Sequence, residues 1–351
     1  MAEYRPKHRG MERVLGTGAL FSTAYGNVGS SIYYALGLVA IYAAGMTPVV
    51  FVIAGLIFAA TAATYTEATT MFPEAGGSSS FARRAFNEFW SFFAAWGQML
   101  TYIITISISA FFVPHYLGVF WDPLGRSPAD IVGGIVVILV LGALNVVGVK
   151  ESAGVNVFFA VADFLTQVLL VVVGCVLVLD PDLLVRQIDF GTVPTVGDFL
   201  IAIPVGMVAY TGIETVSNRA EEARDFGRTI PRGIGLVVLA VAVIYAFLPA
   251  VALSAMPVVN GETVLAKTKE AGGYADDPIL GVVANIDLGP LQGAAEVYVG
   301  VLAATILFIA TNAGLLGVSR LTYSMGQHRQ LPEALRVLHP RFRTPYVAIL
   351  V

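Results

Sequence analysis

The chain has 351 residues and a formal net charge of −4; 57% of its residues are hydrophobic and only 13% are charged. Its mean hydropathy of +0.78 is far above that of soluble domains, which need a polar surface. This composition indicates an integral membrane protein and excludes secreted, nucleic-acid-binding and single-span proteins. The one cysteine, Cys175, lies in an apolar run, so we expect a packing residue and neither an intramolecular disulfide nor a cysteine-based metal cluster.

Eight apolar runs follow one another along the chain, each long enough for a helical span of about 20 residues. They lie at 16–41, 46–71, 89–115, 129–149, 154–179, 197–219, 233–256 and 293–317, and a ninth begins near Pro345. We therefore expect an all-α integral membrane protein in which residues 1–351 form a single transmembrane transporter domain. Because the ninth span is incomplete, we interpret the chain as a fragment of a longer protein.

The distribution of basic residues predicts the orientation of these spans. With the N-terminus in the cytoplasm, the inward-facing segments hold sixteen of the twenty Lys and Arg residues. This asymmetry is the positive-inside pattern of multi-pass proteins of the cytoplasmic membrane. The segment 257–290 then becomes the longest external loop, for which we consider a partly structured lid or cap and a solvated connector.

The first span is interrupted by small and polar residues in the sequence Gly26-Asn-Val-Gly-Ser-Ser31. Gly26 lies about 16 Å from the start of the span, near the middle of the bilayer. An unwound backbone at that depth is tolerated where it lines a cavity or binds a polar ligand. The alternative is a small-residue face for close helix packing.

A second interruption, Tyr210-Thr-Gly-Ile213, lies at a corresponding depth of the sixth span. Two broken helices five spans apart enter the membrane from opposite sides, which is typical of an inverted-repeat secondary transporter. Their free amides favour an anionic group and their free carbonyls favour a cation, so a zwitterion or a small cation fits. The predicted substrate-binding residues are Gly26, Val28, Gly29, Ser30, Ser31, Tyr210, Thr211, Gly212 and Ile213.

Asp163 lies near the middle of the fifth span, where an ionised carboxylate is costly unless it is paired or solvated. We predict that it couples transport to an ion, as a proton carrier or as a ligand of Na⁺ or K⁺. A structural hydrogen-bonding role is the third interpretation. The proton is the favoured coupling ion.

Two glutamates are candidates for gating or structural roles. Glu214 follows the second interruption, where it either caps exposed amides or contacts substrate. Glu67 lies near the cytoplasmic end of the second span, where we expect it to pair with Arg83 or Arg84. We expect no metal site, no cofactor apart from a coupling ion, and no enzymatic activity, because the sequence has no phosphate-binding loop, nucleophile elbow or metal-binding motif.

Three stretches resemble the amino acid-polyamine-organocation (APC) superfamily of permeases. They are Phe72-Pro-Glu-Ala-Gly-Gly-Ser78 with Phe81–Phe86, Ala209–Thr215 with Ala220–Arg232, and Ser319–Ser324 with Leu331-Pro332 and Thr344–Tyr346. The resemblance implies an inverted-repeat transporter with broken first and sixth helices. It further implies secondary active transport of amino acids or related amines by alternating access, either proton-coupled or by exchange. The expected partners are a small-molecule substrate and membrane lipids, not nucleic acid.

Two departures from the family pattern leave alternatives open. The spacing Gly26-Asn-Val-Gly29 is one residue shorter than usual and looks more like that of potassium-uptake carriers of the same superfamily. Asp163 stands where proton-coupled relatives often have lysine, so their coupling mode does not transfer. A potassium-uptake carrier is therefore the alternative function, and a transporter-like membrane sensor is a third.

Overall fold

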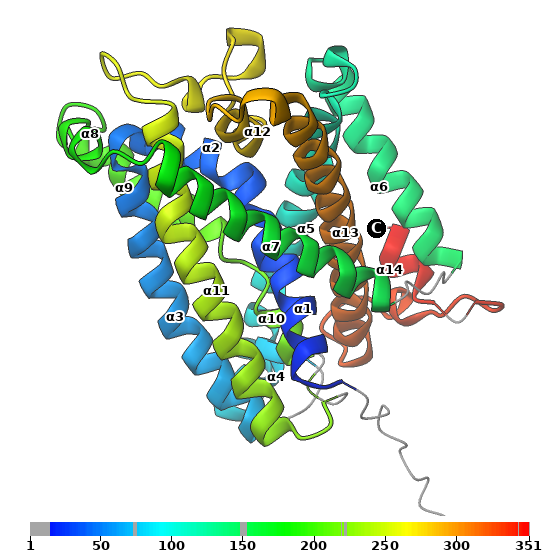
Figure 1. Ribbon diagram of the computed structural model, residues 1–351. Helices are drawn as coiled ribbons and strands as arrows, with labels where there is room; N and C mark the ends of the chain where they lie inside the picture. Colours follow the sequence, from blue (N-terminus) through cyan, green and yellow to red (C-terminus); the bar gives the residue numbers. More distant parts are fainter. Residues whose placement is uncertain are drawn as a thin grey trace, which may run out of the picture.

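The computed structural model describes residues 15–72, 76–147, 153–218, 220, 223–342 and 344–350. Long helices make up most of this part of the chain (Figure 1). The α-helices are α1 (Thr17–Val28), α2 (Ile32–Ala43), α3 (Thr47–Met71), α4 (Gly77–Ala85), α5 (Glu88–Leu117), α6 (Ala129–Val147), α7 (Ala153–Leu177), α8 (Pro181–Arg186), α9 (Val196–Val208), α10 (Glu214–Asn218), α11 (Phe226–Ala255), α12 (Pro278–Ala284), α13 (Gln292–Gln327) and α14 (Tyr346–Leu350).

Some residues used in the sequence argument lie outside the described residues. They are the basic residues of 1–14, Pro73–Ala75, Lys150, Arg219, positions 221 and 222, and Arg343.

Six helical stretches of the described chain are long and apolar enough to cross a membrane. The first, Thr17–Met71, contains α1, α2 and α3; the chain turns back after α2, at Ala44, where φ is +43° (Figure 1). The apolar helix α9, Val196–Val208, is shorter than a full span. The described fold is therefore all-helical, as expected, while the exact number of crossings stays a prediction.

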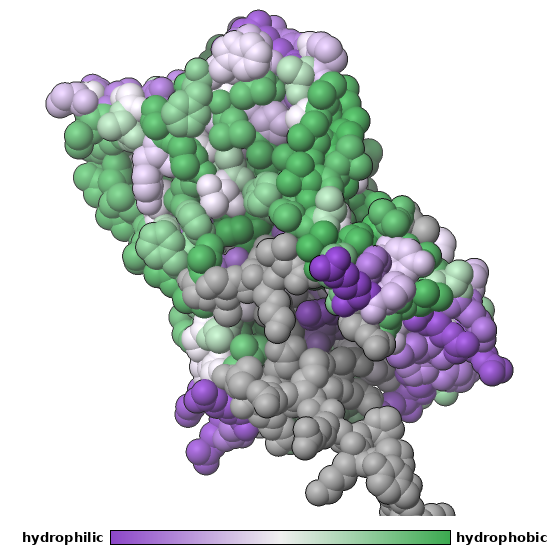
Figure 2. Space-filling model, turned by 90° about the vertical axis from the view of Figure 1, so that its right-hand side faces the viewer, coloured by the Kyte–Doolittle hydropathy of each residue, from purple (hydrophilic) through white to green (hydrophobic). Residues whose placement is uncertain are grey.

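The outer surface of the helices is apolar. Exposed large side chains include Ile135 and Leu139 on α6 and Leu165 and Leu169 on α7. Figure 2 shows hydrophobic side chains over much of one face, with hydrophilic ones gathered toward its ends. Such a surface is stable against lipid and unfavourable in water.

Helix α13 packs closely along α5 because small residues on α13 face that helix. A Cβ built on Gly314 would lie 2.6 Å from Ile106 Cγ1, and one on Gly317 would lie 2.8 Å from Tyr102 Cζ. Small residues allow this approach, which is typical of packing in membranes. The contact between α5 and α13 also holds Tyr102 in place.

The first interruption differs from the expectation of an unwound segment. Residues 26–28 belong to α1, and Gly29–Ser31 form a single 3-10 turn that leads directly into α2. Ser30 Oγ donates to the Asn27 carbonyl at 2.9 Å, which supports this tight turn locally. The expectation of a non-helical stretch at 26–30 is therefore wrong at residues 26–28. In contrast, residues 209–213 form a non-helical turn between α9 and α10.

The segment 257–290 is a structured cap rather than a solvated connector. It contains two 3-10 turns and α12, and Leu265, Ile279 and Val282 are fully buried. A Cβ on Gly37 of α2 would collide with the carbonyl of Ala275, so the cap lies directly on α2. Burial of these apolar side chains fixes the cap on the helices beneath it.

Candidate functional site

The end of α1 lies against the turn between α9 and α10. Asn27 Nδ2 donates to Thr215 Oγ1 at 3.4 Å. Gly212 has φ +126°, and a Cβ built there would lie 2.8 Å from Asn27 Nδ2 and 3.0 Å from Val28 Cγ2. Glycine accommodates both this backbone conformation and this close approach. The two interrupted segments of the sequence are therefore neighbours in space.

The turn between α9 and α10 is stabilised by side chains that follow it. Glu214 Oε2 accepts a hydrogen bond of 3.0 Å from the Gly212 amide, and Thr215 Oγ1 donates to the Gly212 carbonyl. Tyr210 points away from this turn, and its hydroxyl donates to the Phe51 carbonyl at 2.6 Å. Glu214 thus caps an amide that the helix leaves without a partner.

The small residues after α1 are buried and bonded within their own turn. Ser30 and Ser31 are each 1% exposed. The hydroxyl of Ser31 also accepts from Tyr34 at 2.9 Å. A Cβ on Gly29 would lie 2.6 Å from Tyr25 Cζ, so the Tyr25 ring covers this glycine. In this conformation the turn is covered on the Tyr25 side.

Side chains of α7 and α11 satisfy the carbonyls at the end of α1. Tyr245 donates from its hydroxyl to the Val28 carbonyl at 2.7 Å, and Gln167 Nε2 donates to the Gly29 carbonyl at 3.0 Å. The Gly29 carbonyl also accepts a longer bond of 3.5 Å from the Tyr245 hydroxyl, so both of its lone pairs have donors.

Asp163 on α7 is fully buried and held by two uncharged donors. Tyr33 donates from its hydroxyl to Oδ1 at 2.7 Å, and Gln167 Nε2 donates to Oδ2 at 2.8 Å. The other Gln167 amide atom, Oε1, is buried without a hydrogen-bond partner in the described chain, as is the hydroxyl of Tyr25. The described residues contain no group of three or more acidic, His or Cys side chains that would hold a metal ion.

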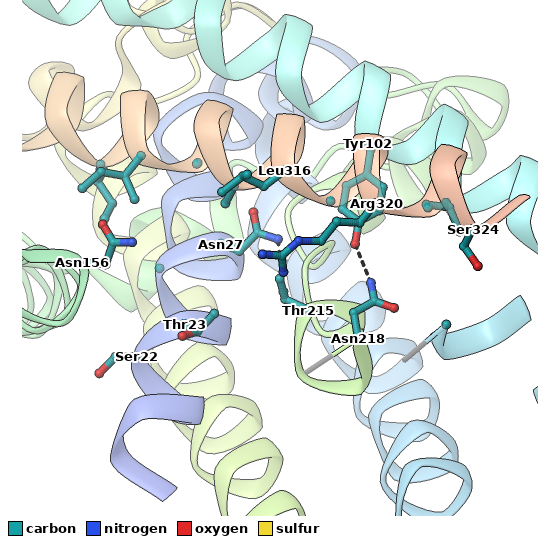
Figure 3. Close-up of a pocket in the computed structure, with 18 residues that line it drawn as sticks. Ser22, Thr23, Asn27, Tyr102, Asn156, Thr215, Asn218, Leu316, Arg320 and Ser324 are labelled. Atoms are coloured by element: carbon teal, nitrogen blue, oxygen red, sulfur yellow. Dashed lines mark hydrogen bonds between the residues drawn. The ribbon is translucent and has the colours of Figure 1, made fainter. Parts of the chain in front are cut away.

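A cavity of about 320 Å³ begins beside Gly26 and Asn27. It extends toward the end of the molecule where α1 starts and α13 ends (Figure 3). Polar residues of α1, α7 and α10 line one side, and mainly apolar residues of α13 line the other. The lining residues are Ser22, Thr23, Gly26, Asn27, Gly76, Tyr102, Asn156, Thr215, Asn218, Ile306, Ile309, Ala310, Ala313, Leu316, Gly317, Arg320, Leu321 and Ser324.

The cavity includes few of the residues predicted from the sequence. Of the nine predicted substrate contacts, one, Gly26, lines the cavity. The predicted coupling residue Asp163 and the predicted gating residue Glu214 are not among the lining residues. The sequence argument missed Asn27, Thr215 and Asn218. Their signal was present, because they are polar residues beside the two interruptions, with Thr215 and Asn218 one helical turn apart.

Glu67 lies on the exposed surface of α3. Arg83 pairs with Glu88 instead, with Nε 2.7 Å from Oε1, and the alternative pairing of Glu67 with Arg84 stays a prediction. Glu88 begins α5 and is closer to Arg83 along the chain, so the short α4–α5 connection brings this pair together.

Comparison with known proteins finds similarity to membrane transporters. The model of a protein family described as "Amino acid permease" matches residues 15–351. The chain is 28% identical over 337 residues to the methylthioribose transporter of Bacillus subtilis, covering 91% of this chain and 68% of the relative. It is 24% identical over 330 residues to the serine/threonine exchanger of the same organism, with 92% and 70% covered. The branched-chain amino acid permease of Bacillus subtilis is 23% identical over 351 residues, with 95% and 70% covered.

Proposed function

Because the chain belongs to the amino acid permease family, a family of multi-pass membrane transporters and not of enzymes, we propose that it carries a zwitterionic amino acid or a closely related solute across the cytoplasmic membrane. The observation that carries this proposal is the cavity that starts at Asn27 and Thr215, where α1 meets the α9–α10 turn, and that has polar residues along one wall. A cavity of about 320 Å³ is at the small end of known ligand pockets, which suits a small solute.

The mechanism we propose is alternating access by an inverted-repeat fold. The α1–α2 and α9–α10 segments serve as the broken first and sixth helices, and the predicted contacts at 26–31 and 210–213 bind the solute when the bundle moves. In this conformation Gly29–Ser31 are covered, whereas the cavity beside Gly26 is open toward the end of α13. With the N-terminus in the cytoplasm, this arrangement corresponds to an inward-open state.

We propose that Asp163 couples this movement to a proton. It stands on α7, whereas its donor Tyr33 is on α2, and Gln167 links it to the Gly29 carbonyl. If Asp163 is protonated and the Gln167 amide reverses, the new O–H donates to Gln167 Oε1, which has no partner among the described residues. The same side chains can thus hold both protonation states, and Na⁺ or K⁺ remain the alternative coupling ions. No other cofactor is proposed.

The potassium-uptake alternative is less well supported. The described residues that line the cavity include one cationic side chain, Arg320, and no carboxylate. A bare cation would meet repulsion there that no anionic group of the lining offsets.

Uptake into proteoliposomes that contain the purified full-length protein tests the proposed function. The panel comprises the twenty L-amino acids, methylthioribose and Rb⁺ as a tracer for K⁺. We expect saturable uptake of at least one amino acid, stimulated by an inward proton gradient. Rb⁺ uptake with no amino acid flux would support the potassium carrier instead, and binding without any flux would support a sensor.

A further inference from the structure

Arg320 projects from α13 into the cavity. It lies three residues after Gly317 and four residues before Ser324, which is about one helical turn in each direction. All three residues line the cavity. Figure 3 shows its guanidinium directed toward Asn27 and Thr215, above Asn218. Within the described chain no hydrogen bond or ion pair of its guanidinium is found, and the side chain is exposed to the cavity.

A second donor lines the same cavity. The hydroxyl oxygen of Tyr102 accepts from Asn218 Nδ2 at 2.9 Å and from Gln98 Nε2 at 3.4 Å. Because both bonds use lone pairs of this oxygen, its own hydrogen remains to be donated. Gly317 packs against the ring of Tyr102 and fixes the position of this hydroxyl.

The opposite wall supplies an acceptor. Asn27 Oδ1 is buried and has no hydrogen-bond partner among the described residues, while its Nδ2 is occupied by Thr215. An unpartnered buried acceptor costs free energy that a ligand donor recovers. The cavity lining therefore includes a cation and a hydroxyl donor, and Asn27 on the opposite wall holds a buried acceptor that has no partner among the described residues.

We infer that Arg320 and Tyr102 form a binding subsite for the carboxylate of the transported solute, with the solute's ammonium directed toward the Asn27 side of the cavity. This inference rests on the proposed function and deepens it. A guanidinium binds a carboxylate through two parallel N–H···O bonds, which fixes its orientation as well as its charge. The subsite lies toward the C-terminal end of α13, so it differs from the predicted contacts at 26–31.

Two properties follow from this position. The subsite favours solutes that carry a carboxylate over amines that lack one, because only a carboxylate gains binding free energy from the guanidinium. It also acts on one side of the membrane, because Arg320 lies in the part of the cavity that is nearer to the end of α13. Solute that enters or leaves through that end meets Arg320.

Transport kinetics in oriented vesicles test the subsite. Right-side-out and inside-out vesicles carrying the full chain are assayed with the best amino acid of the panel and with its methyl ester. We expect Arg320→Gln to raise KM for the amino acid about 10- to 100-fold on the side where α13 ends. A rise of this size is typical when hydrogen bonds between a protein and a charged group of its ligand are lost. KM for the methyl ester and KM on the other side should change less than twofold.

Further variants separate binding from structure. Arg320→Lys keeps the charge without the planar fork and should give an intermediate KM, while Tyr102→Phe should raise KM about 2- to 10-fold. Arg329→Gln is the matched control, since Arg329 is exposed beyond α13 and does not line the cavity. If Arg320→Gln fails to insert into the membrane, the KM values of Tyr102→Phe and Arg320→Lys test the subsite instead. Unchanged KM values in both variants would then overturn it.

Unchanged KM in Arg320→Gln, or an equal rise for acid and ester on both sides, would overturn the subsite while leaving the proposed function intact. Absence of flux for every amino acid in the wild type would instead overturn the proposed function, and the subsite with it.

Discussion

At the scale of single residues, Asp163 connects parts of the molecule that alternating access would move. Its carboxylate is bonded to Tyr33 of α2, and Gln167, one turn further along α7, is bonded to both Asp163 and the Gly29 carbonyl. A buried carboxylate without a cationic partner is costly when ionised. A change in its proton content therefore changes how strongly α7 holds the α1–α2 segment.

We predict that Asp163→Asn abolishes accumulation driven by a pH gradient and retains exchange of substrate across the membrane. Asn keeps the volume and an acceptor for Tyr33, and its amide can donate to Gln167 Oε1, so the fold should persist. Uptake under imposed pH, Na⁺ and K⁺ gradients, with counterflow as the measure of exchange, checks this prediction.

The control for this variant is Asp198→Asn, at a partly exposed position in the first turn of α9. Wild-type accumulation by Asp163→Asn under all three gradients would leave only a structural role for Asp163. A loss of apparent affinity for Na⁺ or K⁺ would indicate a cation ligand.

At the scale of helices, the stripe of small residues on α13 determines how closely it approaches α5. We predict that Gly317→Ala destabilises the protein by about 1–3 kcal/mol, because the added methyl group would lie 2.8 Å from Tyr102 Cζ and must displace the ring. Gly142→Ala on α6 is the matched control, since its Cβ would meet nothing within 4 Å. Thermal unfolding in detergent should show a lower midpoint for Gly317→Ala alone; equal midpoints would mean that the α5–α13 contact is loose.

The cap formed by residues 257–290 carries a pH-dependent contribution to stability. Burial raises the pKa of Asp277 to about 6, and the ammonium of Lys269, 3.6 Å away, opposes that rise. The folded cap thus retains a proton that the unfolded chain has already released at pH 5. The resulting stabilisation is complete below the ordinary pKa of 3.8 and is lost as pH rises through about 6.

We therefore predict that the unfolding midpoint of the wild type falls, relative to that of Asp277→Asn, as pH rises from 5 to 7. Asn cannot titrate, so its curve lacks this contribution, and a difference of a few degrees is expected. Differential scanning fluorimetry in detergent measures both curves, with Asp182→Asn on exposed α8 as control. Parallel curves would show that Asp277 has an ordinary pKa.

At the scale of the whole molecule, the proposed orientation assigns the cap to the outside and the end of α13 to the cytoplasm. In a Cys175→Ser background, we predict that Glu270→Cys reacts with a membrane-impermeant maleimide in intact cells and that Gln327→Cys reacts only after permeabilisation. Both positions are exposed. The reverse pattern would invert the topology and place the Arg320 subsite on the outer side.

Much of the fold could be predicted because the apolar runs are long and lipid leaves few alternatives to a helix for them. Composition alone determined the membrane class, and the positions of Gly, Ser and Tyr beside Gly26 and Gly212 located the segments that meet at the site. The conformation of these segments was less predictable. Glycine and serine tolerate helix as well as unwound chain, and Ser30 and Ser31 are stabilised as a 3-10 turn by local bonds to Asn27.

The pairing of polar side chains was decided by the tertiary structure. Counting residues along the helix predicts that Asp163 lies near the middle of the membrane. How α7 is rotated against α1 and α2 decides that Asp163 bonds Tyr33 and Gln167 and does not line the cavity. Arg320 is likewise an ordinary basic residue near a helix end in the sequence. It becomes a cavity residue because Gly314 and Gly317 let α13 approach α5 and turn that face inward. Hydropathy and spacing thus determined the membrane class and the all-helical fold, whereas contacts between distant helices determined which polar groups share one cavity, since close packing fixes helix rotation and sequence spacing does not.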